Sequence, residues 1–191
     1  FLGFPFSISE EFQKRNTNST IDESFKTVET VLNLAHKNNK ELVLYLSMGF
    51  GNPYGEHWHP DIVTRWADKL HSELGVVNMA LSDTIGIADS SLVKSLFTTL
   101  IPSLPEVEIG AHLHTIPSNA QSLIESAYNA GCRKFDGAIK GFGGCPMATD
   151  ILTGNMPTEV MIDWFNDNKI ENSIDLKELN IATKKALDIF P

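Results

Sequence analysis

Two histidines in the stretch AHLHT form the clearest candidate for a metal-binding pair in this sequence. His112 and His114 are two residues apart, and within a strand this spacing directs both side chains to the same face of a sheet. Neutral imidazoles that share a face can bind one divalent cation. A packed histidine beside a hydrogen-bonded histidine fits the same spacing, so both interpretations stay open on these residues alone.

An acidic residue lies in the stretch LSDTIG, directly after another apolar run. Asp83 is expected at the end of a strand, where its carboxylate can orient a ligand or transfer a proton. The same carboxylate can simply cap the turn that follows the strand. Taken alone, the position favours the capping role.

A glycine-rich stretch, GFGGCPMATDILTGN at residues 141–155, contains the third group of candidates. Cys145 presents a thiol that can donate or accept a proton. Asn155 ends the stretch with a side-chain carbonyl that suits a hard cation. Glycines permit positive φ angles and the movement of a lid, and the candidates for this role are Gly141, Gly143 and Gly144. A glycine-rich surface loop with an incidental cysteine is the alternative.

The elements that must position these side chains follow from alternating apolar and amphipathic segments. Short apolar runs predict buried strands, and the first run is the weakest because it contains Pro5. We expect the strands over residues 1–9, 41–48, 76–83, 107–114 and 134–139.

Apolar residues at helical spacing fall between the predicted strands. They predict a helix over residues 21–35, which Thr20 and Glu23 begin with a capping box. A second helix is expected over residues 62–74, with Gly75 as its C-cap.

Two further helices follow the same spacing. One is expected over residues 92–100 and should stop at Pro102. The other should be capped by Ser118 and end at Gly131.

Strands and helices that alternate in units of about 30 residues predict a parallel sheet with helices outside it. A doubly wound open sheet and a (β/α)₈ TIM barrel are the two candidate architectures. The chain has no GxGxxG turn after its first strand, which disfavours a dinucleotide-binding fold. Polar groups gather at the ends of the strands, where TIM barrels carry their active sites, in SMG, SDTIG, HLHT and IKGFGG. The barrel is therefore the favoured prediction.

Five predicted strands are too few to close a barrel of about eight strands. We therefore expect an N-terminally truncated portion of a TIM barrel, with about five of the eight β/α units and the missing units upstream of Phe1. Residues 1–191 are expected to form one partial barrel domain, with residues 158–191 as its C-terminal helices.

Composition excludes several classes of function. The net charge is −9 and no basic run is present, which argues against nucleic-acid binding. No apolar stretch approaches the roughly 20 residues that a membrane-spanning helix needs. Two cysteines, Cys132 and Cys145, are too few for a secreted disulfide scaffold. We expect a reducing compartment, with the cytoplasm favoured and the mitochondrial matrix as the alternative.

These residues together resemble the hydroxymethylglutaryl-CoA lyase family, within the metal-dependent lyases and Claisen-type synthases built on TIM barrels. The matching stretches are SEEFQKRNTNSTIDES, SDTIG, AHLHT, GFGGCPMA and LTGNMPTE, in the order of the family. The GGCP stretch followed by GN is typical of the lyases. Condensing relatives carry a Gly-Glu-Arg type of segment before the GN instead.

The resemblance implies roles for the candidate residues. His112, His114 and Asn155 would bind a divalent cation, Mg²⁺ or Mn²⁺. Cys145 would be the catalytic cysteine on a mobile lid, and Asp83 an active-site carboxylate. Further groups, an arginine and a metal-binding aspartate from the first barrel strand and a glutamate from the second, would lie upstream of this chain.

The activity that the resemblance implies is cleavage of 3-hydroxy-3-methylglutaryl-CoA to acetyl-CoA and acetoacetate, a retro-Claisen step of leucine degradation and ketone-body metabolism. An acyl-CoA would be the small-molecule partner, and a homodimer the assembly. The alternatives are an aldolase or an acyl-CoA condensing synthase of the same superfamily, and a catalytically inactive fragment. The chain alone is expected to be inactive.

Overall fold

The computed structural model describes residues 1–144 and 153–190, and its centre is a five-stranded parallel sheet with the order β1-β2-β3-β4-β5. The strands are β1 (Leu2–Ser7), β2 (Leu42–Ser47), β3 (Asn78–Asp83), β4 (Glu108–Leu113) and β5 (Phe135–Asp136). Each strand lies within the segment that the sequence predicts. Because spatial order follows chain order without reversal, the arrangement is that of a partial barrel and not of a doubly wound sheet.

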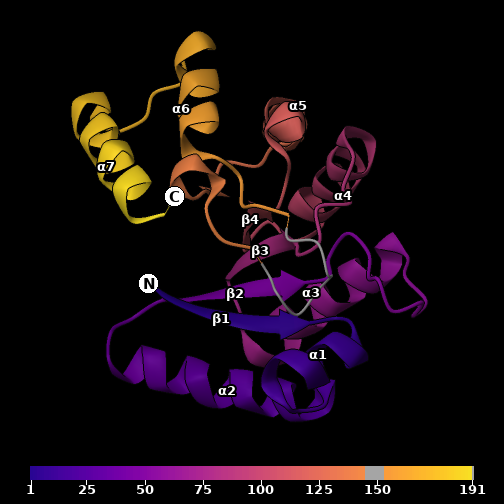
Figure 1. Cartoon of the computed structure of the whole chain (residues 1–191). Helices are drawn as coiled ribbons and strands as arrows, with labels where there is room; N and C mark the ends of the chain where they lie inside the picture. Colours follow the sequence, from indigo (N-terminus) through magenta and orange to yellow (C-terminus); the bar gives the residue numbers. More distant parts are fainter. Residues whose placement is uncertain (145–152, 191) are drawn as a thin grey trace.

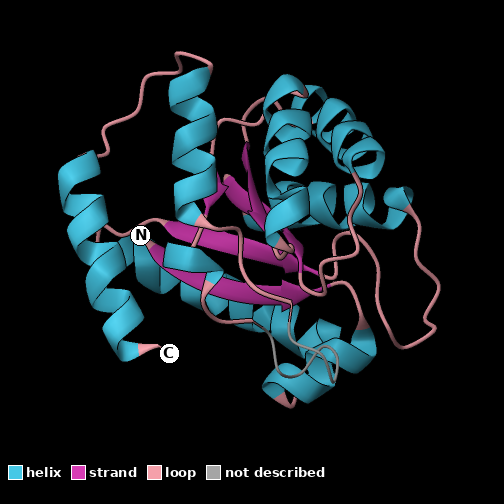
Figure 2. Cartoon of the chain, turned by 45° about the horizontal axis from the view of Figure 1, so that its top comes forward, coloured by secondary structure: helices cyan, strands magenta, loops and turns pink. Residues whose placement is uncertain are grey.

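Helices follow the strands and cover one side of the sheet. The helices are α1 (Glu10–Thr17), α2 (Ile21–Lys37), α3 (Pro60–Leu74), α4 (Ser90–Ser103), α5 (Pro117–Asn129), α6 (Thr158–Asp167) and α7 (Leu176–Ile189), with a 3₁₀ turn η1 (Ile139–Gly141) after β5. In Figure 1 they form an arc around the sheet, from α2 at the bottom to α6 at the top. The same central sheet and surrounding helices are visible in the turned view of Figure 2.

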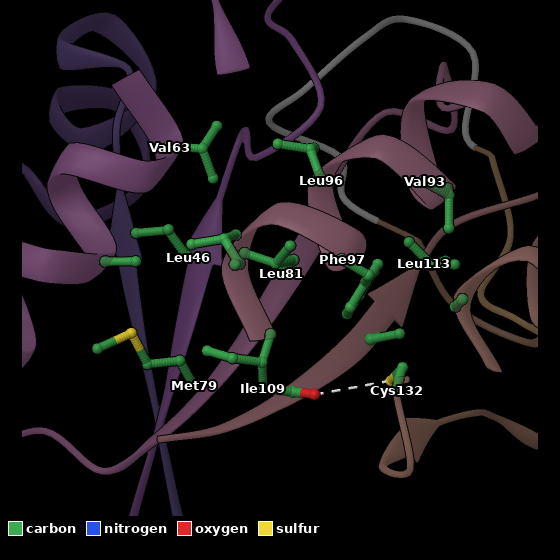
Figure 3. Close-up of a cluster of buried hydrophobic side chains, with 14 of the residues drawn as sticks. Leu46, Val63, Met79, Leu81, Val93, Leu96, Phe97, Ile109, Leu113 and Cys132 are labelled. Atoms are coloured by element: carbon green, nitrogen blue, oxygen red, sulfur yellow. Dashed lines mark hydrogen bonds between the residues drawn. The ribbon is translucent and has the colours of Figure 1, made fainter. Parts of the chain in front are cut away.

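The outer face of the sheet packs against these helices in one apolar core. Leu46, Leu81 and Ile109 point from three neighbouring strands toward Phe97 of α4, as Figure 3 shows. Cys132 lies at the edge of the same cluster, with its thiol 3.7 Å from the carbonyl oxygen of Ile109. The apolar positions alternate with positions that face the other way, and these carry the polar side chains of the candidate site.

The helix ends confirm two local predictions. Thr20 accepts the backbone N–H of Glu23, and the Glu23 carboxylate accepts the backbone N–H of Thr20, which completes the capping box. Gly75 ends α3 with a left-handed φ of 74°, a conformation that costs glycine little.

Two local predictions are wrong, and one helix was not predicted. Ser118 does not cap α5, because Pro117 already occupies the first helical turn, where its fixed φ suits the helix and no N–H is needed. Pro102 does not stop α4, which continues to Ser103 and so contains the proline in its last turn. The helix α1, which Ser9 caps by accepting the N–H of Phe12, was not expected at all.

The sheet is open at both edges, and this explains how β1 tolerates a proline. β1 pairs only with β2, and Pro5 lies opposite Tyr45 in that pairing. An edge strand leaves half of its backbone groups unpaired, so the missing N–H costs no ladder hydrogen bond there. Within the described part of the chain, none of the helices combines the length and the apolar character that crossing a bilayer requires.

The stability of this fold should depend on the core between sheet and helices. Leu81→Ala removes a side chain that is 0% exposed, so we expect the free energy of unfolding to fall by about 2–5 kcal/mol. Leu34→Ala is the matched control, because Leu34 of α2 is 54% exposed and its loss should cost less than about 0.5 kcal/mol. Urea unfolding of both variants measures the difference, and equal losses would contradict this location of the core.

Candidate active site

Polar side chains from three neighbouring strands line a cleft at the carboxyl ends of the sheet. The cleft has a volume of about 460 Å³. Tyr45 and Ser47 come from β2, Ser82 from β3 and His112 from β4, while His114 follows β4 directly. Because all of these strands are parallel, their carboxyl ends meet at one edge, as the sequence predicts for a barrel active site.

His112 lies beside a carboxylate from the next strand. The Nδ1 atom of His112 is 3.2 Å from Oδ2 of Asp136. The two residues lie directly opposite each other in the pairing of β4 with β5. Burial alone would raise the pKa of Asp136, but interactions with His112 and Tyr45 outweigh burial and lower it. Burial and then the Asp136 carboxylate raise the pKa of Tyr45 to about 12, so its phenol stays neutral.

His114 is a buried side chain at the end of β4. The residue is 6% exposed, and its Nδ1 atom is buried without a hydrogen-bond partner among residues 1–144 and 153–190. Its ring centroid lies 5.6 Å from that of His112. Burial, and secondarily the nearby His112, lowers the pKa of His114 to about 4, so the imidazole is neutral at physiological pH. A neutral imidazole with an unpaired buried nitrogen has the properties of a metal ligand.

Asn155, the last residue of the glycine-rich stretch, lies next to His114. The two residues form an isolated antiparallel bridge, and the N–H of Thr115 donates to the carbonyl of Gly154 over 2.9 Å. The side-chain Nδ2 of Asn155 donates to the carbonyl of Phe142 over 2.8 Å. This bond fixes the amide and leaves its Oδ1 as the acceptor.

Two glycines allow the backbone to approach Asn155 this closely. Gly141 has a φ of 68°, and a Cβ there would lie 2.7 Å from the backbone oxygen of Asn155. Gly143 has a φ of 93°, and a Cβ there would lie 2.9 Å from Nδ2 of Asn155. Gly144 lines the cleft. The expected positive φ angles are therefore confirmed for Gly141 and Gly143 but not for Gly144, while the movement of this segment as a lid stays a prediction.

Asp83 is buried under the loop that follows β3. The residue is 1% exposed, and its carboxylate accepts the backbone N–H groups of Gly86 at 3.0 Å, Ile87 at 3.2 Å and Ala88 at 2.8 Å. Burial raises the pKa of Asp83, and the backbone hydrogen bonds oppose that effect. Its backbone carbonyl also accepts the N–H of His114 over 3.1 Å. These contacts are those of a capping residue that supports the site, and a catalytic role for Asp83 stays a prediction.

The donor atoms at the cleft can supply part of the ligand set of a cation. His112 offers Nε2, His114 its unpaired Nδ1 and Asn155 its Oδ1, and none of these atoms is an anionic oxygen. Among residues 1–144 and 153–190, no three histidine, cysteine, aspartate or glutamate side chains gather as a complete metal site. Mg²⁺ prefers anionic oxygen ligands, so a hard cation at this place would need a carboxylate in addition.

Two residues of the site were missed by sequence reasoning, and one predicted residue lies outside the described residues. Tyr45 interrupts the leucines of LVLYLS, and Asp136 lies in the run KFDGAI. Period-two alternation would have placed both side chains on the same face of the sheet as His112, if the register between the strands had been known. Cys145 belongs to residues 145–152, so its role stays a prediction.

Comparisons with known proteins agree with this fold and identify a family. The model of the HMGL-like family matches residues 3–185. Hydroxymethylglutaryl-CoA lyase YngG of Bacillus subtilis is 32% identical over 178 residues, which cover 93% of this chain and 59% of that protein. The chain thus spans less than two thirds of this curated relative.

Two solved structures are similar over almost the whole chain. The HMG-CoA lyase of Bacillus subtilis has a TM-score of 0.88 and 31% identity, and the match covers 97% of this chain and 62% of that one. An HMG-CoA lyase from Acinetobacter baumannii in complex with coenzyme A and 3-methylmalate has a TM-score of 0.83 and 26% identity, covering 93% of this chain and 57% of that one. The structural neighbours are TIM barrels, so the five β/α units described above form part of such a barrel.

The buried neutral state of His114 predicts a pH-dependent stability in metal-free protein. The pKa of His114 is about 4 in the folded chain and about 6.5 when unfolded, so the unfolded state binds more protons between these values. The contribution of His114 to stability is therefore complete above pH 6.5 and is lost as the pH falls toward 4. Urea unfolding at pH 7 and pH 5 in the presence of a chelator measures this loss.

His114→Gln should reduce the loss of stability between the two pH values, because the amide does not titrate. His57→Gln is the control, since His57 is exposed to solvent. A loss of the same size in wild type and in His114→Gln would contradict the buried neutral imidazole.

Proposed function

Because the chain belongs to the HMGL-like family, we propose that it is part of a divalent-metal-dependent carbon–carbon lyase that cleaves 3-hydroxy-3-methylglutaryl-CoA to acetyl-CoA and acetoacetate. Enzymes of this family generally depend on a divalent cation. The observation that carries the proposal is the buried, unpaired Nδ1 of His114 beside the fixed amide of Asn155, at the carboxyl end of β4.

The proposed substrate is an acyl-CoA with a branched hydroxy-acid head. The Acinetobacter baumannii relative binds coenzyme A together with 3-methylmalate, a hydroxylated dicarboxylic acid, which supports this class. The walls of the cleft combine apolar carbon from Pro5 and Phe12 with the hydroxyls of Ser47 and Ser82. Such a lining suits a head group that carries both a methyl branch and polar oxygens.

We propose that His112, His114 and Asn155 bind the cation, Mg²⁺ or Mn²⁺. A cation bound there would lower the pKa of the substrate hydroxyl and orient the neighbouring carboxylate. The remaining anionic ligand would come from the first-strand aspartate that the family resemblance implies. His114 contributes a lone pair without first losing a proton, because its low pKa keeps it neutral.

The reaction breaks one carbon–carbon bond and moves two protons. The tertiary hydroxyl of the substrate loses its proton and becomes the ketone of acetoacetate, and the departing acetyl-CoA carbanion gains a proton. On the family resemblance alone, we propose that the thiol of Cys145 gives this carbanion its proton. Asp83 would act on the site through the loop that it caps, since the adjacent Thr84 lines the cleft.

Several finer properties are also proposals. The cytoplasmic location, the role in leucine degradation and the homodimeric assembly follow from composition and from the resemblance, and each stays a prediction. The inactivity of residues 1–191 alone is also proposed, because both edges of the sheet are open and no described carboxylate completes the donor set.

The activity is tested by incubating the full-length protein with Mn²⁺ and a panel of acyl-CoA thioesters. We expect acetoacetate from 3-hydroxy-3-methylglutaryl-CoA, no acetoacetate after chelation, and none from residues 1–191 expressed alone. Cleavage or condensation of another acyl-CoA or oxo acid, with 3-hydroxy-3-methylglutaryl-CoA inert, would indicate the aldolase or synthase alternative. No turnover of any panel member by the full-length protein would indicate a catalytically inactive relative.

The proposed role of Cys145 predicts a loss of turnover. Cys145→Ser should lower kcat by about 10²–10⁴-fold and leave KM nearly unchanged, because a hydroxyl has a much higher pKa than a thiol and is therefore a much poorer proton donor that hardly ionises near neutral pH. Cys132→Ala is the matched control: Cys132 is fully buried, and burial raises the pKa of its thiol to about 12, so its loss should affect stability and not kcat. Steady-state kinetics with an unchanged kcat in Cys145→Ser would contradict the role.

A further inference from the structure

We propose that Asp136 is a positioning residue that fixes the ring of His112, so that Nε2 is the nitrogen presented to the cleft. The inference rests on the proposed function in one respect, namely that His112 binds the cation. The orientation of the ring itself depends only on this chain's own contacts and can be measured without metal.

The contact between the two residues determines which nitrogen of His112 carries the hydrogen. Nδ1 of His112 lies 3.2 Å from Oδ2 of Asp136. An ionised carboxylate only accepts hydrogen bonds, so Nδ1 must donate. In a neutral imidazole the other nitrogen, Nε2, then carries the lone pair that a cation needs.

Two features of the sheet fix this contact. His112 and Asp136 are register partners on neighbouring parallel strands, so their side chains leave the same face of the sheet next to each other. The Tyr45 ring also packs against His112, with ring centroids 5.0 Å apart and an interplanar angle of 76°. Tyr45 also interacts with the Asp136 carboxylate, so this one carboxylate contacts both Tyr45 and His112.

Space for this arrangement is made by a glycine in β1. A Cβ at Gly3 would lie 2.9 Å from Cε2 of Tyr45, closer than packed carbon atoms approach. The absence of that Cβ leaves this space to the Tyr45 ring, which also contacts His112. The ring of His112 thus contacts both the Tyr45 ring and the Asp136 carboxylate, and the Asp136 hydrogen bond selects its tautomer.

The two proposed histidine ligands are thus fixed by different means. His114 has no partner at Nδ1 among the described residues, and its backbone is held by the bridge to Asn155. His112 lies on a more open part of the cleft, with its side chain 31% exposed, and would rotate or change tautomer without a partner. Carboxylates that hold a ligand histidine in this way also increase its basicity, and their loss typically costs about 10–100-fold in metal affinity.

The first readout is the tautomer of His112 in metal-free full-length protein, measured from the ¹⁵N chemical shifts of the imidazole nitrogens. We expect a single Nδ1–H tautomer in the wild type, and a shift toward Nε2–H in Asp136→Ala. An unchanged tautomer in a folded Asp136→Ala protein would overturn the proposal. Assignment comes from the loss of the corresponding signals in His112→Gln.

The second readout is the affinity for Mn²⁺, measured by calorimetric titration. Asp136→Ala should weaken binding about 10–100-fold, and Asp136→Asn, whose amide oxygen still accepts the Nδ1–H bond, should weaken it less and keep the Nδ1–H tautomer. Glu108→Ala is the matched control: it removes a carboxylate of β4, the strand that carries His112, where Glu108 pairs with Lys134 at 3.1 Å, and it should leave tautomer and affinity unchanged.

The variants separate positioning from a merely structural role. If Asp136→Ala does not fold, Asp136→Asn decides: a folded protein with a weaker Mn²⁺ affinity supports the proposal, and an unchanged affinity overturns it. Equal losses in Asp136→Ala and Glu108→Ala would also overturn it, because a general disturbance of the paired strands β4 and β5 would then explain both. A wild type that shows the Nδ1–H tautomer but binds no Mn²⁺ would contradict the proposed metal site while leaving the orientation of His112 by Asp136 in place.

Discussion

The site depends on the register between the parallel strands of the sheet. Along each strand, apolar side chains that point to the outer face alternate with polar side chains that point to the inner face. Leu81 and Ala111 face the helices, while their neighbours Ser82 and His112 line the cleft. Ser82 lies opposite His112, and His112 lies opposite Asp136 in the next pairing. A slip of one residue would bury the polar set in the core and expose the leucines, so the same burial that stabilises the sheet also aligns the functional groups.

Close backbone approach is the second requirement, because one of the proposed ligands comes from outside the strands. The carbonyl of Gly141 accepts the N–H of Asn155 over 3.0 Å, and the carbonyl of Leu113 accepts the N–H of Met156 over 3.0 Å. These bonds attach the segment to the ends of β4 and η1. Side chains at the glycines of this region would separate the two backbones and move the amide of Asn155 away from His114.

Much of this arrangement could be predicted from the sequence, and the limits have physical reasons. Periodicity alone predicts that His112 and His114 share a face, because that relation lies within one strand. It does not predict that Asp136 lies beside His112, because pairing between strands depends on the tertiary register. Asp83 shows a further limit: ligand and cap were both compatible with its position, and only the backbone N–H groups of residues 86–88 show where its carboxylate is engaged.

The central claim is that two histidines at the end of β4 bind one divalent cation. It is tested most directly by electron spin echo spectroscopy of Mn²⁺ bound to full-length protein in which histidine is labelled with ¹⁵N. The account predicts couplings from two imidazole nitrogens, of which one disappears in His112→Gln and the other in His114→Gln. Bound Mn²⁺ without any coupling to histidine nitrogen would contradict it.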